Sequence, residues 1–111
     1  MRKPNSVNIL GINYTIQYVA NPAEVDIYKR ESLWGQIDFW TRSIRIYDNG
    51  RSMEDILQTI FHEVIHGIVC DLHMKAFNSN TDHEEIDLLA LGLTDVLVRN
   101  GWICLEENGD E

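Results

Sequence analysis

The stretch from residue 52 to residue 74, SMEDILQTIFHEVIHGIVCDLHM, decides the fold because it predicts one long amphipathic helix. Ser52 stands three residues before Asp55, a variant of the capping box that opens a helix. The apolar residues recur at intervals of three and four, which places one stripe of them on a helix face: Leu57, Phe61, Val64, Ile65, Ile68 and Leu72. We therefore expect a helix from about residue 52 to about residue 74.

Within this helix, His62-Glu63-Val64-Ile65-His66 places two imidazoles one turn apart on the same face. Two nitrogens at that spacing can bind one Zn²⁺ at about 2.0–2.1 Å each. Glu63 stays close to the pair, where its carboxylate can take a proton from a zinc-activated water and pass it to a leaving amine. By average composition the pattern arises by chance in well under about 1% of chains this short, so it indicates a zinc site rather than two surface histidines.

A catalytic zinc usually has three protein ligands, so a third ligand must come from elsewhere in the chain. His73 follows on the same helix but is too distant. At about 1.5 Å rise per residue it lies roughly 10 Å beyond His66 and 16 Å beyond His62 along the axis. The next predicted helix is the better source.

That second helix is predicted from about residue 82 to about residue 99, with a stop signal at Asn100-Gly101. Its expected buried stripe comprises Ile86, Leu89, Leu93, Val96 and Leu97. Its first turns offer four candidate ligands: His83, Glu84, Glu85 and Asp87. Glu85 is preferred because its i+4 and i+7 neighbours, Leu89 and Gly92, are expected to face the first helix. Glu84, the expected partner of Thr81 in a second capping box, and then His83 are the alternatives.

Residues 6 to 49 alternate between apolar and polar side chains, as half-buried strands do. One strand is expected over Val7 to Val19, and a hairpin over Leu33 to Phe39 and Ser43 to Tyr47. A loop or short helical turn is expected after Pro22, and a final short strand over Trp102 to Leu105. Strands followed by helices predict an α+β fold, and 111 residues fit a single domain spanning residues 1–111.

Composition restricts the partners. The chain is 44% hydrophobic and 24% charged with a net charge of −9, and its Lys and Arg residues form no cluster. Binding to nucleic acid or to an anionic membrane surface is therefore disfavoured. No apolar run approaches the roughly 18 residues of a membrane span, and no signal peptide is predicted. Two cysteines without a CxxC pair, Cys70 and Cys104, favour a reducing, cytoplasmic setting.

The spacing from the HExxH motif through 18 residues to Glu85 resembles the gluzincin pattern of zinc metallopeptidases. Residues 85–90, EIDLLA, are also similar to the Glu-Ala-Asn-x-Phe-Ala segment of ImmA/IrrE-type metallopeptidases of phages and mobile elements. The short chain further resembles the minigluzincins. The resemblance implies a zincin-like fold, with a small, mostly antiparallel sheet followed by two main helices. It also implies that His62, His66 and Glu85 bind zinc and that Glu63 is the general base.

The resemblance further implies that the strand before the motif helix, Ser43 to Tyr47, is the sheet edge where a peptide adds. Trp34, Phe39 and Trp40 would line pockets there, although ordinary core and hairpin packing is the alternative. Thermolysin-like enzymes orient a ligand histidine with an Asp four residues after the third ligand, and that position is Leu89 here. The candidate oxyanion stabilisers are Tyr14, Tyr47, His73 and His83.

These observations predict a hydrolase, specifically a zinc metalloendopeptidase acting on a peptide or protein substrate, of phage or prophage type. The alternative is a catalytically silent or latent zinc-bound module that captures a peptide at its sheet edge. A latent form would be held in check by self-association or by a regulatory partner.

Overall fold

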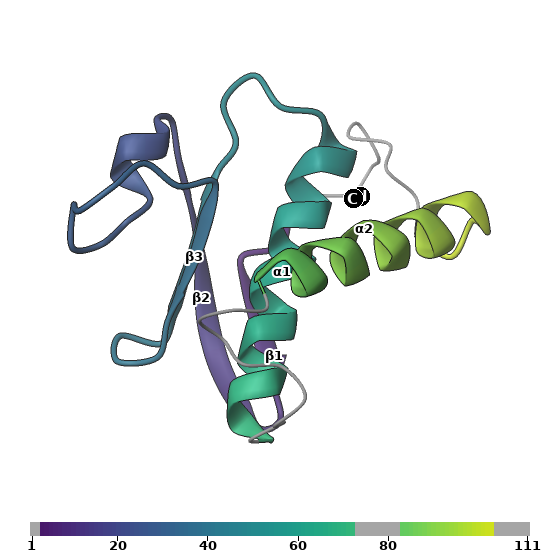
Figure 1. Cartoon of the computed structure of the whole chain (residues 1–111), viewed down its shortest axis with the longest axis horizontal. Coiled ribbons are helices and arrows are strands. Elements are labelled where there is room, and N and C mark those ends of the chain that lie inside the picture. The colour runs from purple at the N-terminus through teal and green to yellow at the C-terminus, as the bar shows by residue number, and fades with distance from the viewer. Residues whose placement is uncertain (1–2, 73–82, 104–111) are drawn as a thin grey trace.

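The computed structural model describes residues 3–72 and 83–103, which form three layers (Figure 1). A four-stranded sheet packs on one side of helix α1 (Met53–Asp71), and helix α2 (His83–Arg99) crosses α1 on the side away from the sheet. The strands are β1 (Ser6–Ile9), β2 (Ile12–Val19), β3 (Gly35–Asp38) and β4 (Ser43–Tyr47). The expected α+β order, strands followed by two main helices, is confirmed.

The sheet is mixed, with the strand order β1-β2-β4-β3. The β1–β2 and β3–β4 pairs are antiparallel, whereas β2 and β4 run parallel. This order places β4 between β2 and β3, so the expectation that Ser43 to Tyr47 forms the sheet edge is wrong. The edge strand beside the motif helix is β3.

Residues 7 to 19 form a hairpin rather than the single expected strand. The chain turns at Leu10 and Gly11, whose φ angles of 51° and 92° both lie in the left-handed region, as in a type I′ turn. Ile9 and Ile12 pair across this two-residue turn, so their side chains lie on the same face of the sheet and the inward-facing positions shift from odd to even residue numbers. The turn was missed because leucine occupies a position that normally favours Asn, Asp or Gly.

The second hairpin, β3–β4, is confirmed with Gly35 opposite Ile46 and Asp38 opposite Ser43. Its connection is fixed by the Asp38 carboxylate, which accepts hydrogen bonds from the Thr41 backbone N–H at 2.9 Å and the Thr41 hydroxyl at 2.6 Å. These bonds hold the pKa of Asp38 below its usual value. The predicted turn after Pro22 is a short 3₁₀ helix, Pro22–Glu24.

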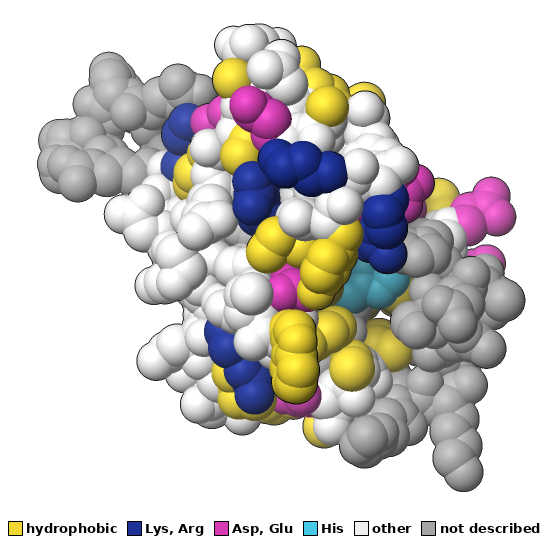
Figure 2. Space-filling model, turned by 90° about the vertical axis from the view of Figure 1, so that its left-hand side faces the viewer, with side chains coloured by type: hydrophobic (Ala, Val, Ile, Leu, Met, Phe, Trp, Pro, Cys, Tyr) yellow, Lys and Arg dark blue, Asp and Glu magenta, His cyan; other side chains and the backbone are white. Residues whose placement is uncertain are grey.

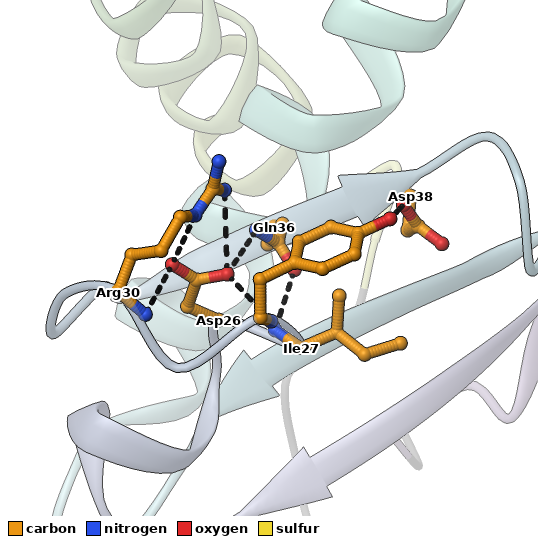
Figure 3. A network of polar contacts seen from close by, with 6 residues as sticks. Asp26, Ile27, Arg30, Gln36 and Asp38 are labelled. Atoms are coloured by element: carbon orange, nitrogen blue, oxygen red, sulfur yellow. Dashed lines mark hydrogen bonds and ion pairs between the residues drawn. The ribbon is translucent and has the colours of Figure 1, made fainter.

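The segment between β2 and β3 is anchored to β3 by a polar network (Figure 3). The buried Asp26 carboxylate accepts hydrogen bonds from the Arg30 guanidinium, from two backbone N–H groups and from the Gln36 side chain. The bond from Arg30 contributes most to holding the pKa of Asp26 well below its usual range. The Tyr28 hydroxyl donates to Asp38 at 3.0 Å. The network thus ties this segment to both ends of the edge strand.

The main core lies between the sheet and α1. It contains Ile9, Tyr14, Ile16, Ile44, Ile46, Met53, Ile56 and Ile60. The predicted helix start is confirmed, because the Ser52 hydroxyl accepts a hydrogen bond from the Asp55 N–H at 3.1 Å. Helix α1 ends at Asp71. Met74 and Thr81 lie outside the described residues.

Helix α2 ends as predicted. Gly101 adopts a φ of 73°, and the Trp102 N–H donates back to the Leu97 carbonyl at 3.0 Å. Trp102 and Ile103 form no strand, and Cys104 and Leu105 lie outside the described residues. Neither α1 nor α2 is long and apolar enough to cross a membrane.

The buried face of α2 differs from the predicted stripe. Ile86, Ala90 and Thr94 are buried, whereas Leu89, Leu93 and Val96 are exposed. The small side chains of Ala90 and Thr94 let α2 lie close to its neighbour, and the Thr94 hydroxyl donates to the Ala90 carbonyl at 2.8 Å. The expectation that Leu89 and Gly92 face the first helix is therefore wrong, because the face of α2 that packs against its neighbour carries the small residues Ala90 and Thr94.

Candidate metal centre

The two motif histidines meet on the surface of α1. Their Nε2 atoms are 3.0 Å apart, and their ring centroids are 4.7 Å apart. The His62 side chain is 18% exposed and His66 is 9% exposed, so the pair is reachable from solvent without being fully solvated. Figure 2 shows histidine side chains (cyan) at the surface, bordered by hydrophobic (yellow) and Lys or Arg (dark blue) side chains.

The spacing of the two nitrogens suits a shared cation. Two lone pairs aimed at one point repel each other unless a proton or a metal ion lies between them. Nitrogen ligands of a tetrahedral zinc are about 3.3 Å apart, given zinc–nitrogen bonds of about 2.05 Å. The observed 3.0 Å is close to that value, so a small adjustment would let His62 and His66 bind one zinc ion.

Asp87 of α2 lies against the outer nitrogen of His62. Its Oδ1 atom is 3.3 Å from His62 Nδ1. A carboxylate there favours the tautomer with a proton on Nδ1, in which Nε2 carries the lone pair that can bind a metal ion. Asp87 therefore lies where a carboxylate can orient the His62 ring, a partner that the sequence left unidentified because Leu89 occupies the expected position. The sequence signal for Asp87 is its spacing from the buried residues of α2. Asp87 lies three residues before Ala90 and seven before Thr94, so it falls near the same face of the helix.

Glu63 points from α1 toward the edge strand. The residue is only 6% exposed, and the Ile37 backbone N–H donates a hydrogen bond to its carboxylate. Burial raises the pKa of Glu63 to about 8, although the Ile37 bond acts in the opposite direction. The metal-free protein therefore holds a protonated Glu63 at neutral pH, a group poised to exchange a proton there.

The close approach of β3 to α1 depends on Gly35. A Cβ atom at this position would lie 2.7 Å from Thr59 Cγ2 and 3.2 Å from Glu63 Oε2. Thr59 cannot easily move, because its hydroxyl donates to the Asp55 carbonyl and accepts a hydrogen bond from Arg51 at 2.6 Å. The missing side chain thus brings the edge-strand backbone to the Glu63 carboxylate.

Replacing Gly35 with alanine is expected to destabilise the protein by about 1–3 kcal/mol, the usual cost of overpacking. The measurement is the free energy of unfolding in urea, followed by circular dichroism. The double variant Gly35→Ala/Thr59→Ser removes the methyl group that the new Cβ meets while keeping the hydroxyl, and should recover most of the loss. A Gly35→Ala protein as stable as the wild type would contradict the close approach.

Arg51 fastens the start of α1 to the sheet. Its guanidinium donates to the carbonyls of Tyr47 and Asp55, and it stacks 4.5 Å from the centre of the Trp34 ring. Trp34 remains 63% exposed in this stack. Phe39 packs edge-on against Tyr14 at 6.3 Å, and Trp40 is 87% exposed. Pocket-lining roles for Trp34, Phe39 and Trp40 stay predictions.

The proposed third ligand, Glu85, is exposed in the first turn of α2, as is Glu84. Within residues 3–72 and 83–103, no three His, Cys, Asp or Glu side chains gather closely enough to hold a metal ion. The structure thus pairs His62 with His66 and places Asp87 against His62, whereas Glu63 is buried against β3 and Glu85 forms no hydrogen bond or ion pair with any of them among the described residues. The role of Glu85 stays a prediction. His73 and the His83 side chain lie outside the described part.

Two candidate oxyanion stabilisers are described. Tyr14 belongs to the core and is 1% exposed, and its hydroxyl has no hydrogen-bond partner within the described part of the chain. Tyr47 ends β4, where its ring lies 5.7 Å from the Arg51 guanidinium. Neither position tests the predicted role.

Comparison of the chain with protein-family models finds no match. Comparisons with curated proteins and with solved structures likewise give no significant match.

Proposed function

We propose that this protein is a zinc-dependent peptide hydrolase in which His62 and His66 bind the metal and Glu63 is the general base. One observation carries the proposal. Two imidazole nitrogens lie 3.0 Å apart, and the carboxylate of Glu63, next to His62 in the sequence, is buried against the backbone of an edge strand. We further propose a cytoplasmic, phage-type enzyme with a zincin-like fold. The free thiol of Cys70 suits a reducing compartment.

In the proposed reaction, Glu63 and Asp87 have different roles beside the metal ion. A zinc ion, when bound, would polarise the scissile carbonyl and lower the pKa of a water molecule toward about 7. Glu63 in its ionised form accepts a proton from the attacking water and returns it to the leaving amine, because burial raises the pKa of its carboxylate and so makes it a stronger base. Asp87 holds the proton on His62 Nδ1 and so keeps the ring in its metal-binding orientation.

The free edge of β3 is the proposed place for the substrate backbone. The Tyr47 N–H donates to the Trp34 carbonyl, so the backbone groups of the alternate residues Gly35 and Ile37 point away from β4. An extended peptide could pair with the carbonyls on that edge. Its scissile bond would then pass beside Glu63, which contacts the same edge.

A catalytically silent or latent module that captures a peptide at this edge is the alternative. It is favoured by the absence of an assembled three-ligand group among the described residues. A third ligand would then be supplied by a partner, by a movement of α2, or not at all.

Elemental analysis of the purified protein tests the metal site. We expect about one zinc per chain, lost in His62→Ala and in His66→Ala. Among Glu84→Gln, Glu85→Gln and Asp87→Asn, the variant that loses metal most completely identifies the third ligand. Asp87→Asn should weaken binding by about 10- to 100-fold if it only orients His62.

Glu31→Gln, which removes an exposed carboxylate away from α1 and α2, is the matched control and should keep its zinc. A wild-type protein that binds no zinc under chelator-free conditions would overturn the hydrolase and the zinc-bound module alike.

A further inference from the structure

Nothing in residues 3–72 and 83–103 explains Gly92. It lies in the middle of α2, where glycine is less favourable than alanine. A Cβ atom built on Gly92 would meet no atom of these described residues within 4 Å. By contrast, Gly67 of α1 lets the helix approach the sheet, since its Cβ would lie 3.0 Å from Ile9. Gly92 has no such close contact among the described residues.

The surroundings of Gly92 form an exposed stripe on the outer flank of α2. Steps of four, three, four and three residues place five positions on it: Glu85, Leu89, Gly92, Val96 and Arg99. Leu89 and Val96 are almost half exposed. We call these five residues the α2 stripe. Its C-terminal half projects beyond α1 (Figure 1), so α1 does not cover it.

The α2 stripe is self-complementary in an antiparallel arrangement. If two copies cross at Gly92, Leu89 of one protomer meets Val96 of its partner. The acidic first turn, which contains Glu84 and Glu85, then lies beside Arg99 of the other copy. A parallel arrangement would instead bring two acidic turns together in a chain that already carries a net charge of −9.

We propose that the α2 stripe is a homodimer interface in which two α2 helices cross antiparallel, in contact at Gly92. Glycine at a crossing lets two helix backbones approach closely, which accounts for its presence at an otherwise costly position. Antiparallel pairing also sets the helix dipoles in opposite directions. The Arg99–Asp95 ion pair, 2.9 Å long, lies on the surface and can exchange for the partner's carboxylates.

This inference does not rest on the proposed function, because the contacts of Leu89, Gly92, Val96 and Arg99 need no metal ion, although Glu84 and Glu85 are also candidate zinc ligands. Sedimentation equilibrium of the full chain tests it, at roughly 5 to 200 µM, where small interfaces dissociate. With and without a chelator, we expect a concentration-dependent mass that approaches twice the 12.9 kDa of one chain. A mass of one chain throughout, or a dimer that forms only with zinc, would overturn the interface.

Variants locate the interface on α2. Val96→Asp and Leu89→Asp should each raise the dimer dissociation constant at least tenfold. Leu91→Asp is the matched control, because Leu91 is similarly exposed but lies about a third of a turn away from the stripe. It should leave the constant unchanged, and equal effects of Leu91→Asp and Val96→Asp would refute the assignment.

Gly92→Gln separates dimerisation from folding. Glutamine favours a helix more than glycine does, so the variant should have a higher melting temperature as a monomer. Its side chain should nevertheless block the crossing and raise the dissociation constant at least tenfold. Arg99→Glu should weaken the dimer and Arg99→Lys should preserve it. A Gly92→Gln protein that dimerises like the wild type would contradict the crossing at this residue.

Discussion

Glu63→Gln is expected to reduce peptide hydrolysis by about 10²–10⁴-fold while leaving about one zinc ion bound per chain. Glutamine fills the same space and can still face the Ile37 N–H, but it cannot accept a proton from water. The metal ligands are untouched, so metal content should remain. The measurement combines the rate of cleavage of a peptide library with elemental analysis of the same sample.

Glu54→Gln provides the control for this experiment, because Glu54 lies in the first turn of the same helix, two turns before the motif. It should hydrolyse peptide at the wild-type rate. If Glu63→Gln cleaves as fast as the wild type, Glu63 is not the base. If neither the wild type nor Glu63→Gln cleaves peptide although both bind zinc and the same peptide, the protein is better described as a silent binding module.

Glu63→Gln is also expected to stabilise the metal-free protein increasingly as the pH rises. The folded-state pKa of Glu63 is raised from 4.5 to about 8, so folding favours the protonated form. The stability that this preference provides is fully present below pH 4.5 and is lost as the pH rises through 8. The lost contribution is on the order of 5 kcal/mol.

The measurement is the free energy of unfolding between pH 5 and pH 9, with a chelator present because a bound cation would change the titration of Glu63. The difference between Glu63→Gln and the wild type should grow across this range. Glu31→Gln corrects for the loss of one charge from the chain. A difference that is independent of pH would show that the Glu63 carboxylate is solvated in the folded state.

Local sequence signals predicted the elements that depend on local chemistry. The Ser52 cap, the start of α1 and the β3–β4 hairpin were predictable from the sequence, because caps, helical periodicity and strand alternation act over a few residues. The Leu10-Gly11 turn was not, because Leu10 adopts a left-handed conformation that its residue type disfavours.

The buried face of α2 could not be predicted from local sequence signals, because it is set by tertiary packing. Hydrophobicity favoured Leu89 and Leu93 for the buried face of α2, whereas the structure buries Ala90 and Thr94. That choice rotates the helix and brings Asp87, rather than Glu85, to the His62 ring. The pairing of His62 with His66 was predictable because it depends only on one helical turn.

The contact between Glu63 and Ile37 has a consequence for solubility. An edge strand with unpaired backbone donors is a template on which another chain can add and begin an aggregate. The Glu63 carboxylate occupies the Ile37 N–H, so it leaves one fewer donor available on the exposed side of β3. Glu63, the proposed general base, therefore also reduces uncontrolled association at the edge of β3. A peptide that binds to this edge must compete with the Glu63 carboxylate for the Ile37 N–H.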